Sequence, residues 1–304
     1  MTGFLNVYKE AGYTSHDVVA IVRKLTGVKV GHTGTLDPQA EGVLPICLGR
    51  ATKLADMITG QEKSYVAEVM LGVVTDTGDM TGQVLARPPV VFNEEAIRTA
   101  VEGFHGEQQQ VPPMYSALKI GGKKLYELAR QGQTVERKPR LVNISAIRVT
   151  EYFSETNSFT IDVTCSKGTY IRSLCMDIGE ALGTGAAMGT LLRTRSGAFF
   201  VDSAVKITQI REAAADGSLE HMILPVEKVL TFPRAYVKPE GLVMARNGNA
   251  LPLGLVEMSM PTEDGVHVIT RESKVWLHGP DGLIGLFYVD SANGAAKLRS
   301  EVML

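Results

Sequence analysis

One stretch organises this chain: Gly31-His32-Thr33-Gly34-Thr35-Leu36-Asp37-Pro38-Gln39-Ala40-Glu41-Gly42-Val43-Leu44-Pro45. Its glycines allow backbone conformations that other residues avoid, and Pro38 keeps Asp37 out of helical geometry. An aspartate before proline is also a common turn residue, which accepts hydrogen bonds from its own backbone. This loop is long, however, and an apolar run over 43–48 follows it, as is typical of a site held on a scaffold. The stretch therefore predicts a rigid loop that presents Asp37, with His32 close by.

The composition is that of an ordinary globular protein, with 304 residues, 44% of them apolar and 21% charged. A chain of this length can bury one large core or two unequal ones. The first residues lack the pattern of a secretory signal, and no run approaches the roughly 18 apolar residues of a membrane span. Cys47, Cys165 and Cys175 are too widely spaced for a disulfide framework or a zinc site. We therefore expect a cytoplasmic protein with reduced, buried thiols and no membrane association.

The charge is distributed unevenly along the chain. The net charge is −2, but residues 111–150 contain eight lysines and arginines and only two acidic residues. This segment therefore carries +6, and the rest of the chain −8. A local basic field can bind phosphates even on an acidic protein. It can equally be a solvated charged face, and charge alone leaves both interpretations open.

Periodicity and turn residues predict mixed secondary structure up to about residue 232. Ser15 is the expected cap of a helix that ends at Gly27, and Asn93 of a helix with Ala96, Ile97 and Val101 turned inward. Other expected helices cover 51–59, 125–130 and 207–215, and one more follows the turn over 166–172 and reaches about Leu182. The expected strands cover 3–9, 63–71, 140–152, 158–165 and 191–195. The predicted class is α+β, with a mixed, largely antiparallel sheet.

The texture of the sequence changes near Pro233. Helical periodicity ends there. The remaining sequence contains three residue pairs typical of hairpin turns, Asn247-Gly248, Asp264-Gly265 and Asp281-Gly282. We interpret residues 1–232 as a catalytic domain and residues 233–304 as a separate small β-barrel domain.

The chemistry that the chain can support is limited by what the sequence lacks. It shows no metal-ligand spacing, no Ser-His-Asp or Cys-His set, and no zinc-deaminase signature. Asp76 and Asp79 lack the further oxygen ligands of a calcium loop. A lone carboxylate with an arginine and a tyrosine suits chemistry on a sugar or base without a cofactor. Arg172 would keep Asp37 ionised through a charge-assisted contact.

Four motifs, in order and in spacing, resemble those of TruB-type tRNA pseudouridine synthases. They are the loop over 31–38 with 42–45 and 49–54, then 63–65 (Lys-Ser-Tyr), 111–119 (Val-Pro-Pro-Met-Tyr-Ser-Ala-Leu-Lys) and 167–172 (Lys-Gly-Thr-Tyr-Ile-Arg). The segment Lys9–Ser15 is also similar, with Glu10 where the family commonly has proline. The resemblance covers most of residues 3–230. The last 70 residues resemble, in texture, the PUA-like RNA-binding domain that ends bacterial members.

The resemblance implies an enzyme that isomerises uridine 55 in the T loop of tRNA to pseudouridine, with no cofactor, metal or protein partner. Asp37 would be the catalytic aspartate and Arg172 its partner. Tyr65 would stack on the flipped base and accept its C5 proton. Without the motif, Tyr65 would be interpreted as a core tyrosine on a strand, and Arg172 as a solvent-facing arginine.

The resemblance also implies contacts with the RNA. Leu191 would lie against the base, His32 would fill the space that the base leaves, and Asp79 would lie near the RNA. The residues expected at phosphates are Lys53, Lys119, Lys123 and Lys124. Taken alone, Leu191 is a core residue and His32 a structural histidine. The PUA-like domain would contact the acceptor arm.

Two alternatives stay open from the sequence. One is the related guide-dependent synthase subunit, which acts inside an RNA–protein particle and carries basic tails. The other is a tRNA-folding chaperone or RNA-binding protein without catalysis. The default oligomeric state is a monomer.

Overall fold

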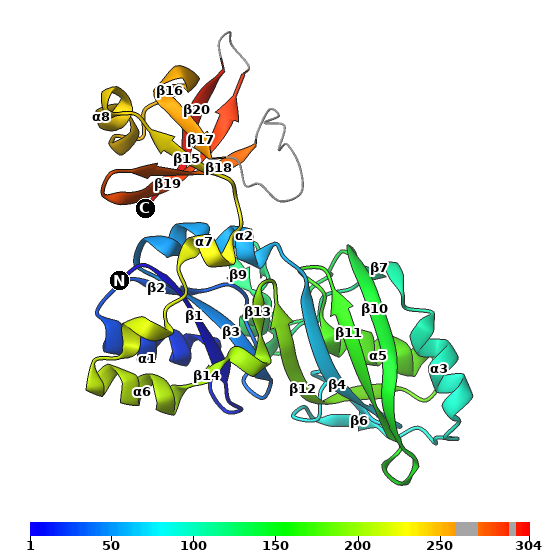
Figure 1. Ribbon diagram of the computed structural model, residues 1–304. Coiled ribbons are helices and arrows are strands. Elements are labelled where there is room, and N and C mark those ends of the chain that lie inside the picture. Colours follow the sequence, from blue (N-terminus) through cyan, green and yellow to red (C-terminus); the bar gives the residue numbers. More distant parts are fainter. Residues whose placement is uncertain (260–272, 292–295) are drawn as a thin grey trace.

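The computed structural model describes residues 1–259, 273–291 and 296–304, which form two main sheets and their helices (Figure 1). The first sheet consists of β1 (Gly3–Lys9), β2 (Val30–His32), β3 (Glu41–Leu48), β4 (Lys63–Leu71), β7 (Gly106–Gln110), β10 (Arg140–Phe153), β11 (Ser158–Cys165), β12 (Ala186–Ser196), β13 (Phe199–Phe200) and β14 (Val205–Lys206). The helices of this part are α1 (Ser15–Thr26), α2 (Ala55–Thr59), α3 (Glu94–Glu102), α4 (Leu125–Arg130), α5 (Ile171–Ala181), α6 (Ile207–Asp216) and α7 (Val226–Val229). Two short hairpins are attached, β5 (Val74–Thr75) with β6 (Val84–Ala86) and β8 (Lys119–Ile120) with β9 (Lys123–Lys124).

The first sheet is mixed and largely antiparallel, which confirms the predicted class. Its strands run in the order β14-β1-β3-β12-β4-β11-β10-β7, with β2 paired to β3 and β13 to β12. Only two of its pairings are parallel, β1 with β14 and β3 with β12. The parallel β3–β12 pair joins the two halves of the sheet, and the loop before β3 carries Asp37.

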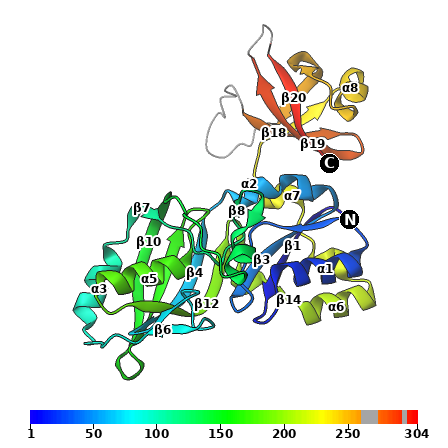
Figure 2. The same cartoon turned by 180° about the vertical axis from the view of Figure 1, so that it is seen from behind.

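Four helices cover one face of this sheet. The largest hydrophobic core contains apolar side chains from α1, α3, α5 and α6 together with every second residue of the strands, for example Tyr65, Ala67 and Val69 of β4. From behind, α3 and α5 are seen in front of the strands (Figure 2). The opposite face of β1 and β3 packs against α2 and α7 through a second core.

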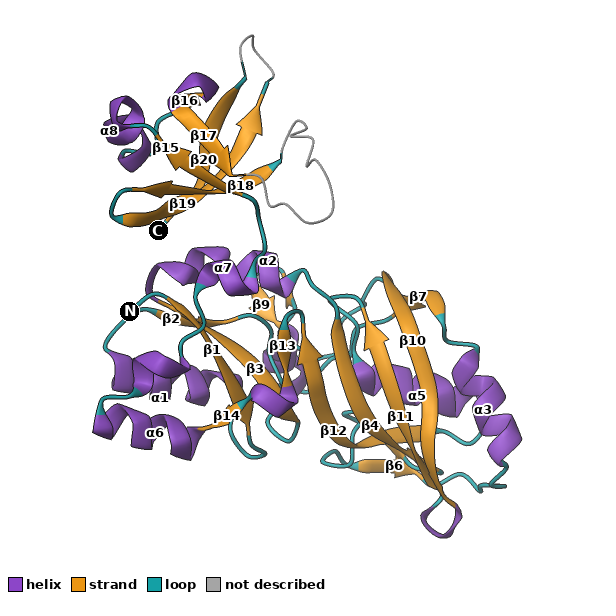
Figure 3. Ribbon diagram, in the orientation of Figure 1, coloured by secondary structure: helices purple, strands orange, loops and turns teal. Residues whose placement is uncertain are grey.

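The second sheet has the order β16-β20-β19-β18-β15-β17 and forms a barrel-like module. It contains β15 (Arg234–Val237), β16 (Leu251–Pro252), β17 (Val256–Ser259), β18 (Lys274–Gly279), β19 (Gly282–Asp290) and β20 (Lys297–Met303), with helix α8 (Leu242–Arg246). Figure 3 shows this module beside α2 and α7. Trp276 is buried there and donates from Nε1 to the Leu230 carbonyl at 2.8 Å.

Two details of the predicted helices are wrong. Thr14, not Ser15, caps α1, because its hydroxyl accepts from the Asp17 N–H while the Asp17 carboxylate accepts from Thr14. Ser15 is buried instead and bonds to the Asp37 loop. On α3, Ile97 and Val101 are buried as expected, but Ala96 is exposed, since it lies in the first turn beyond the edge of the core.

The C-terminal segment differs from the expectation in one respect. It is not purely β, because α8 interrupts it, and Asn247-Gly248 follows this helix instead of forming a hairpin turn. Asp281-Gly282 does join a hairpin, between β18 and β19. Asp264-Gly265 lies outside the described residues. No helix in the described ranges is long and apolar enough to cross a membrane.

Candidate active site

The loop that carries Asp37 lies between β2 and β3, and side chains from distant elements bind its backbone. The Ser15 hydroxyl accepts from the Leu36 N–H at 2.9 Å and donates to the Leu36 carbonyl at 3.1 Å. The fully buried Lys9 ammonium donates to the Pro38 carbonyl at 3.0 Å. Both neighbours of Asp37 are therefore fixed, so the carboxylate starts from a rigid backbone.

Arg193 of β12 fixes the start of the same loop. Its buried guanidinium donates from Nη2 to the Gly34 carbonyl at 3.1 Å and from Nε to the Val43 carbonyl at 2.7 Å. The strand passes so close to Gly42 that a Cβ there would lie 2.3 Å from the Arg193 carbonyl oxygen, and Gly42 also has φ +100°. Only glycine fits this position.

Arg172, on the first turn of α5, faces the carboxylate of Asp37. Its Nε lies 3.0 Å from Oδ2 of Asp37. The arginine side chain is 5% exposed, whereas that of Asp37 is 41% exposed. The cation is thus buried behind an anion that remains accessible, an arrangement suited to a carboxylate that reacts with a ligand.

Arg172 also binds two further segments. Nη1 donates to the Thr77 carbonyl at 3.1 Å and lies 3.6 Å from Oδ2 of Asp79, while Nη2 donates to the Tyr115 carbonyl at 2.6 Å. Its N–H groups therefore connect the Asp37 loop, the 75–83 loop and the segment before β8. Asp79 is brought to the site as a second partner of Arg172.

The N-terminus of α5 is held by a glutamine. Gln110, buried at the end of β7, accepts from the Tyr170 N–H at 2.7 Å and donates to the Tyr170 carbonyl at 3.0 Å. This pair of bonds resembles one rung of a β-ladder. It fixes the residue that caps α5, and with it the position of Arg172 two residues later.

A cavity of about 350 Å³ opens beside Asp37. This volume is within the range of small-molecule sites. The lining comprises residues 34–37, Thr59, Lys63, Tyr65, Ser116, Ala117, Leu118, residues 166–172, Leu191 and Arg193. No cluster of three His, Cys, Asp or Glu side chains that could hold a metal ion occurs within the described parts of the chain.

Tyr65 and Leu191 form an apolar wall of this cavity. Leu191 pairs with Ala67, and Arg193 with Tyr65, across the antiparallel strands β12 and β4. Tyr65 is 7% exposed, and its burial raises the pKa of the phenol above its usual 10.0. A planar ring that enters the cavity would meet an aromatic and an aliphatic surface on this wall.

The ionisation of Asp37 is balanced by its surroundings. Burial raises the pKa of its carboxyl above the ordinary 3.8, and Asp79 acts in the same direction. The Arg172 cation opposes both effects. The carboxylate is therefore more basic than an exposed aspartate and still has a cation that favours its charged form.

His32 is half-buried at the end of β2. Its Nδ1 accepts from the Gly34 N–H at 3.2 Å, and its ring centroid lies 5.7 Å from that of His16. Burial, together with the neighbouring His16, lowers the pKa of His32 to about 4. A neutral imidazole supports the loop here, and His32 is outside the lining of the cavity.

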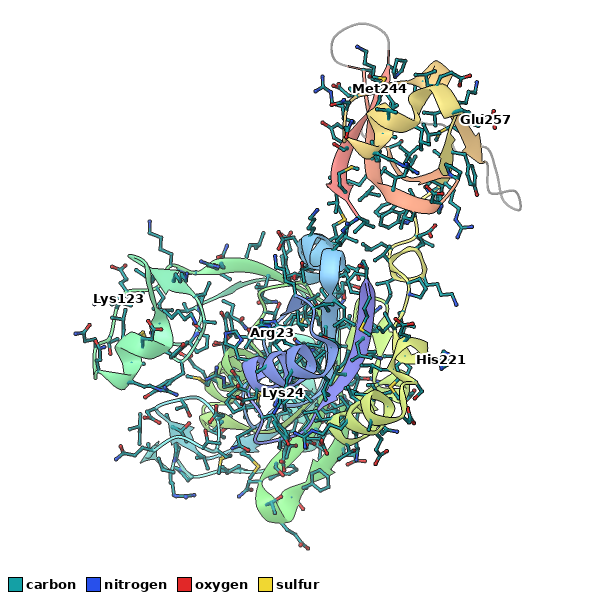
Figure 4. The ribbon with its side chains drawn as sticks, turned by 90° about the vertical axis from the view of Figure 1, so that its left-hand side faces the viewer. Arg23, Lys24, Lys123, His221, Met244 and Glu257 are labelled. Carbon is teal, nitrogen blue, oxygen red and sulfur yellow. The ribbon has the colours of Figure 1, made fainter. Side chains whose placement is uncertain are left out.

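The four lysines expected at phosphates occupy two places. Lys119, Lys123 and Lys124 lie on the β8–β9 hairpin, and Figure 4 shows Lys123 at the outer side of this hairpin. Lys124 lies over the Tyr126 ring, 5.3 Å from its centroid. Lys53 is elsewhere, where it donates to the Met303 carbonyl of β20 at 2.8 Å.

Sequence reasoning did not single out Lys9, Ser15, Lys63 and Arg193 as site residues. A signal for two of them exists, because side chains two apart on a strand share a face. Lys63 accompanies Tyr65 in this way, and Arg193 accompanies Leu191. No local pattern indicates Lys9 or Ser15, whose contacts depend on how α1 meets the loop.

Comparison with known proteins identifies the family of the chain. Residues 22–171 match the family described as "TruB family pseudouridylate synthase (N terminal domain)", and residues 172–231 match "tRNA pseudouridylate synthase B C-terminal domain". The chain is 50% identical over 253 residues to tRNA pseudouridine synthase B of Alkaliphilus oremlandii, with 83% of each chain covered. It is 42% identical over 278 residues to the Bacillus subtilis protein of the same name, with 89% and 90% covered.

Solved structures share the fold over almost the whole chain. One, "Crystal Structure of a Cbf5-Nop10-Gar1 Complex", matches with a TM-score of 0.70 and 28% identity, covering 99% of this chain and 85% of the other. The same TM-score and coverage, at 25% identity, are found for an H/ACA ribonucleoprotein "bound to a substrate RNA containing 2'-deoxyuridine". The family models, the relatives and the fold agree, and the chain belongs to the TruB family of pseudouridylate synthases.

Proposed function

We propose that this chain isomerises uridine 55 in the T loop of tRNA to pseudouridine. The observation that carries the proposal is the contact between Arg172 and Asp37 at the mouth of a cavity with an aromatic wall. The names of relatives that are 41–50% identical support tRNA as the substrate. The cytoplasm is the proposed location, because tRNA substrates are found there.

The proposed reaction begins with a base that leaves its stack. A uridine inside a structured loop is out of reach of a carboxylate until it is flipped out, which costs a few kcal/mol. Stacking on Tyr65 and contact with Leu191 would offset this cost, since base–aromatic stacking is worth about 1–3 kcal/mol. His32 would then support the loop close to the vacated position.

Asp37 is the proposed catalytic residue. Its carboxylate can attack C1′ or C6 of the uridine, or remove a proton from the sugar, and each route requires the ionised form. The N1–C1′ bond breaks, the uracil turns, and a C5–C1′ bond forms. The C5 proton then leaves to water, or to Tyr65 as the phenol passes its own proton on, and N1 gains a proton. The product is an isomer of the substrate, so no redox partner is needed.

The RNA contacts are proposed from charge and position. Lys119, Lys123 and Lys124 lie on one exposed hairpin next to a segment that lines the cavity, and they would contact phosphates of the T arm. Asp79 would act mainly through Arg172. The residues from 233 on are proposed to form a PUA-like domain that contacts the acceptor arm, with the boundary near residue 232. Lys53 would lie at the join between the two parts.

A guide-dependent subunit is the alternative that the solved structures raise, since one is an H/ACA ribonucleoprotein and another is a Cbf5-Nop10-Gar1 complex. We favour a chain that acts directly on tRNA, because the relatives of considerably higher identity are named tRNA pseudouridine synthase B. A pure RNA chaperone would not need the buried Arg172 behind Asp37. We propose a standalone monomeric enzyme.

The test uses a tRNA transcript with tritium at C5 of its uridines, and purified protein without guide RNA or a second protein. We expect release of one equivalent of tritium per tRNA. No tritium should be released when uridine 55 is replaced by cytidine. Asp37→Asn should bind tRNA but release nothing. If the wild-type protein binds the tRNA without releasing tritium, the standalone enzyme is ruled out.

A further inference from the structure

One buried cation of the cavity has a donor to spare. Lys63 begins β4, is 7% exposed, and lines the cavity on the same strand face as Tyr65. Its ammonium donates to the Thr59 carbonyl at 3.0 Å and to the Gln61 carbonyl at 2.9 Å. An ammonium has three N–H donors, so protein carbonyls of the described structure account for two of them.

The other cations of the lining are engaged or exposed. The guanidinium of Arg172 faces Asp37, Asp79 and two carbonyls, and that of Arg193 faces Gly34 and Val43. Lys167 is exposed at the rim. Arg193 also lies beside the Tyr65 phenol. Lys63 is a buried ammonium of this cavity with an N–H donor left for a bound molecule.

The electrostatics of the cavity point to an electron-rich partner for Lys63. The lining contains four cationic side chains and one carboxylate, Asp37, which Arg172 already pairs. Burial, followed by the neighbouring Arg193, lowers the pKa of Lys63 to about 8. Nearby negative charge therefore does not offset the cost of burying this ammonium. A ligand oxygen that gains negative charge during a reaction would be stabilised at this position.

We propose that Lys63 donates a hydrogen bond to a ring carbonyl oxygen, O2 or O4, of the flipped uracil and stabilises negative charge there. The proposal rests on the proposed function. When the N1–C1′ bond breaks, both of its electrons stay on the uracil, and the charge is shared with the carbonyl oxygens. Attack of Asp37 at C6 would place negative charge on O4 alone, because only the C4 carbonyl is conjugated with the C5=C6 bond. A contact at O4 would thus assist every route open to Asp37, and a contact at O2 would assist the routes in which the uracil leaves as an anion.

The test combines protein and substrate substitutions under single-turnover conditions. The variants are Lys63→Met and Lys63→Gln, of which the second retains N–H donors toward Thr59 and Gln61 without the charge. Lys24→Met, at an exposed position on α1, is the matched control (Figure 4). The substrates are T-arm RNAs with uridine, 2-thiouridine or 4-thiouridine at the target, because sulfur is a weaker acceptor than oxygen at the substituted position.

We expect both Lys63 variants to slow isomerisation of the uridine substrate by about 10²–10³-fold, as is typical when one preorganised donor is removed. One thio substrate should react more slowly than uridine with the wild-type protein and with Lys24→Met. With the Lys63 variants, the thio substrate and uridine should react at similar rates. Such non-additivity identifies direct contact, whereas a purely structural role would leave the thio effects unchanged.

Three results would overturn the proposal. If each thio substrate slows the reaction by the same factor in wild type and in both Lys63 variants, the Lys63 ammonium contacts neither carbonyl oxygen. A uridine rate within threefold of wild type in Lys63→Gln excludes the stabilising charge. A wild-type protein that releases no tritium from tRNA overturns the proposed function itself, and is thereby distinguished from a failure of the Lys63 contact alone.

Discussion

The hydroxyl of Ser15 binds both backbone groups of Leu36, accepting from its N–H at 2.9 Å and donating to its carbonyl at 3.1 Å. Leu36 directly precedes Asp37, so the first residue of α1 determines where the carboxylate starts. Both side chains are buried, and the two bonds satisfy backbone groups that would otherwise lack partners. The helix and the active-site loop are in this way one unit.

Ser15→Ala should therefore impair both stability and catalysis. Two backbone groups lose their partner, which should lower the free energy of unfolding by about 1–3 kcal/mol. The freed loop should lower kcat at least tenfold with little change in KM for tRNA, since small displacements of a reacting group are costly. Thr14→Ala is the control, because it removes the helix cap at a cost of about 1 kcal/mol without touching the loop. Equal kcat values for the two variants would contradict the proposed coupling.

Arg172→Gln should shift the pH dependence of kcat to higher pH on the acid side. The Arg172 cation holds the pKa of Asp37 down against burial, so without it that pKa rises further above 3.8. Less carboxylate is then present at a given acidic pH, and kcat at neutral pH should fall by about 10²-fold as positioning is lost. The profile is measured by tritium release from about pH 4.5 to about pH 8, the range above the ordinary pKa of a carboxyl. If kcat falls on the acid side at the same pH as in wild type, or at a lower pH, the prediction is wrong.

Asp79→Asn should shift the acid side of the pH dependence of kcat to lower pH. The Asp79 charge raises the pKa of Asp37, so its removal lowers that pKa and keeps Asp37 ionised to lower pH. Oδ1 of Asp79 accepts from Thr77 and Thr81, and the asparagine oxygen can keep these bonds. A loss of kcat from weaker positioning of Arg172 should accompany the shift. The same tritium assay gives kcat and the pH at which it falls. A shift of that pH to higher values would contradict the inference that the Asp79 charge raises the pKa of Asp37.

His32 should make the folded protein less stable in mild acid. Its folded pKa of about 4 lies below the ordinary 6.5, so between these values the unfolded chain binds a proton that the folded chain does not. The free energy of unfolding therefore falls as pH drops through this window, by up to about 1.4 kcal/mol per pH unit for one proton. Above pH 6.5 this contribution to the slope disappears.

His32→Asn is the matched variant, because the asparagine oxygen can replace Nδ1 as acceptor for the Gly34 N–H. Urea unfolding at pH 7.5 and 5.0 (values on either side of the ordinary histidine pKa) should show a smaller loss of stability in the variant than in wild type. Equal losses in the two proteins would mean that His32 titrates normally.

The sequence by itself determined the local features of this protein. The glycines and Pro38 predicted the loop that presents Asp37, and period-two alternation predicted the strand that buries Tyr65. The predicted α1, β4, β11 and α4 agree closely with the structure, because helix period, strand alternation and turn residues act over a few positions. The family motifs also named Arg172, and the expected ion pair with Asp37 is present.

Tertiary structure alone decided which distant groups meet. The parallel pairing of β12 with β3 brings Arg193 to the carbonyls of Gly34 and Val43, and the packing of α1 turns Ser15 from an expected cap into a loop anchor. Lys53 donates to the Met303 carbonyl of β20, although the resemblance implied only a phosphate contact. These contacts depend on strand order and helix placement, which are set by burial of the whole core and leave no short-range pattern in the chain.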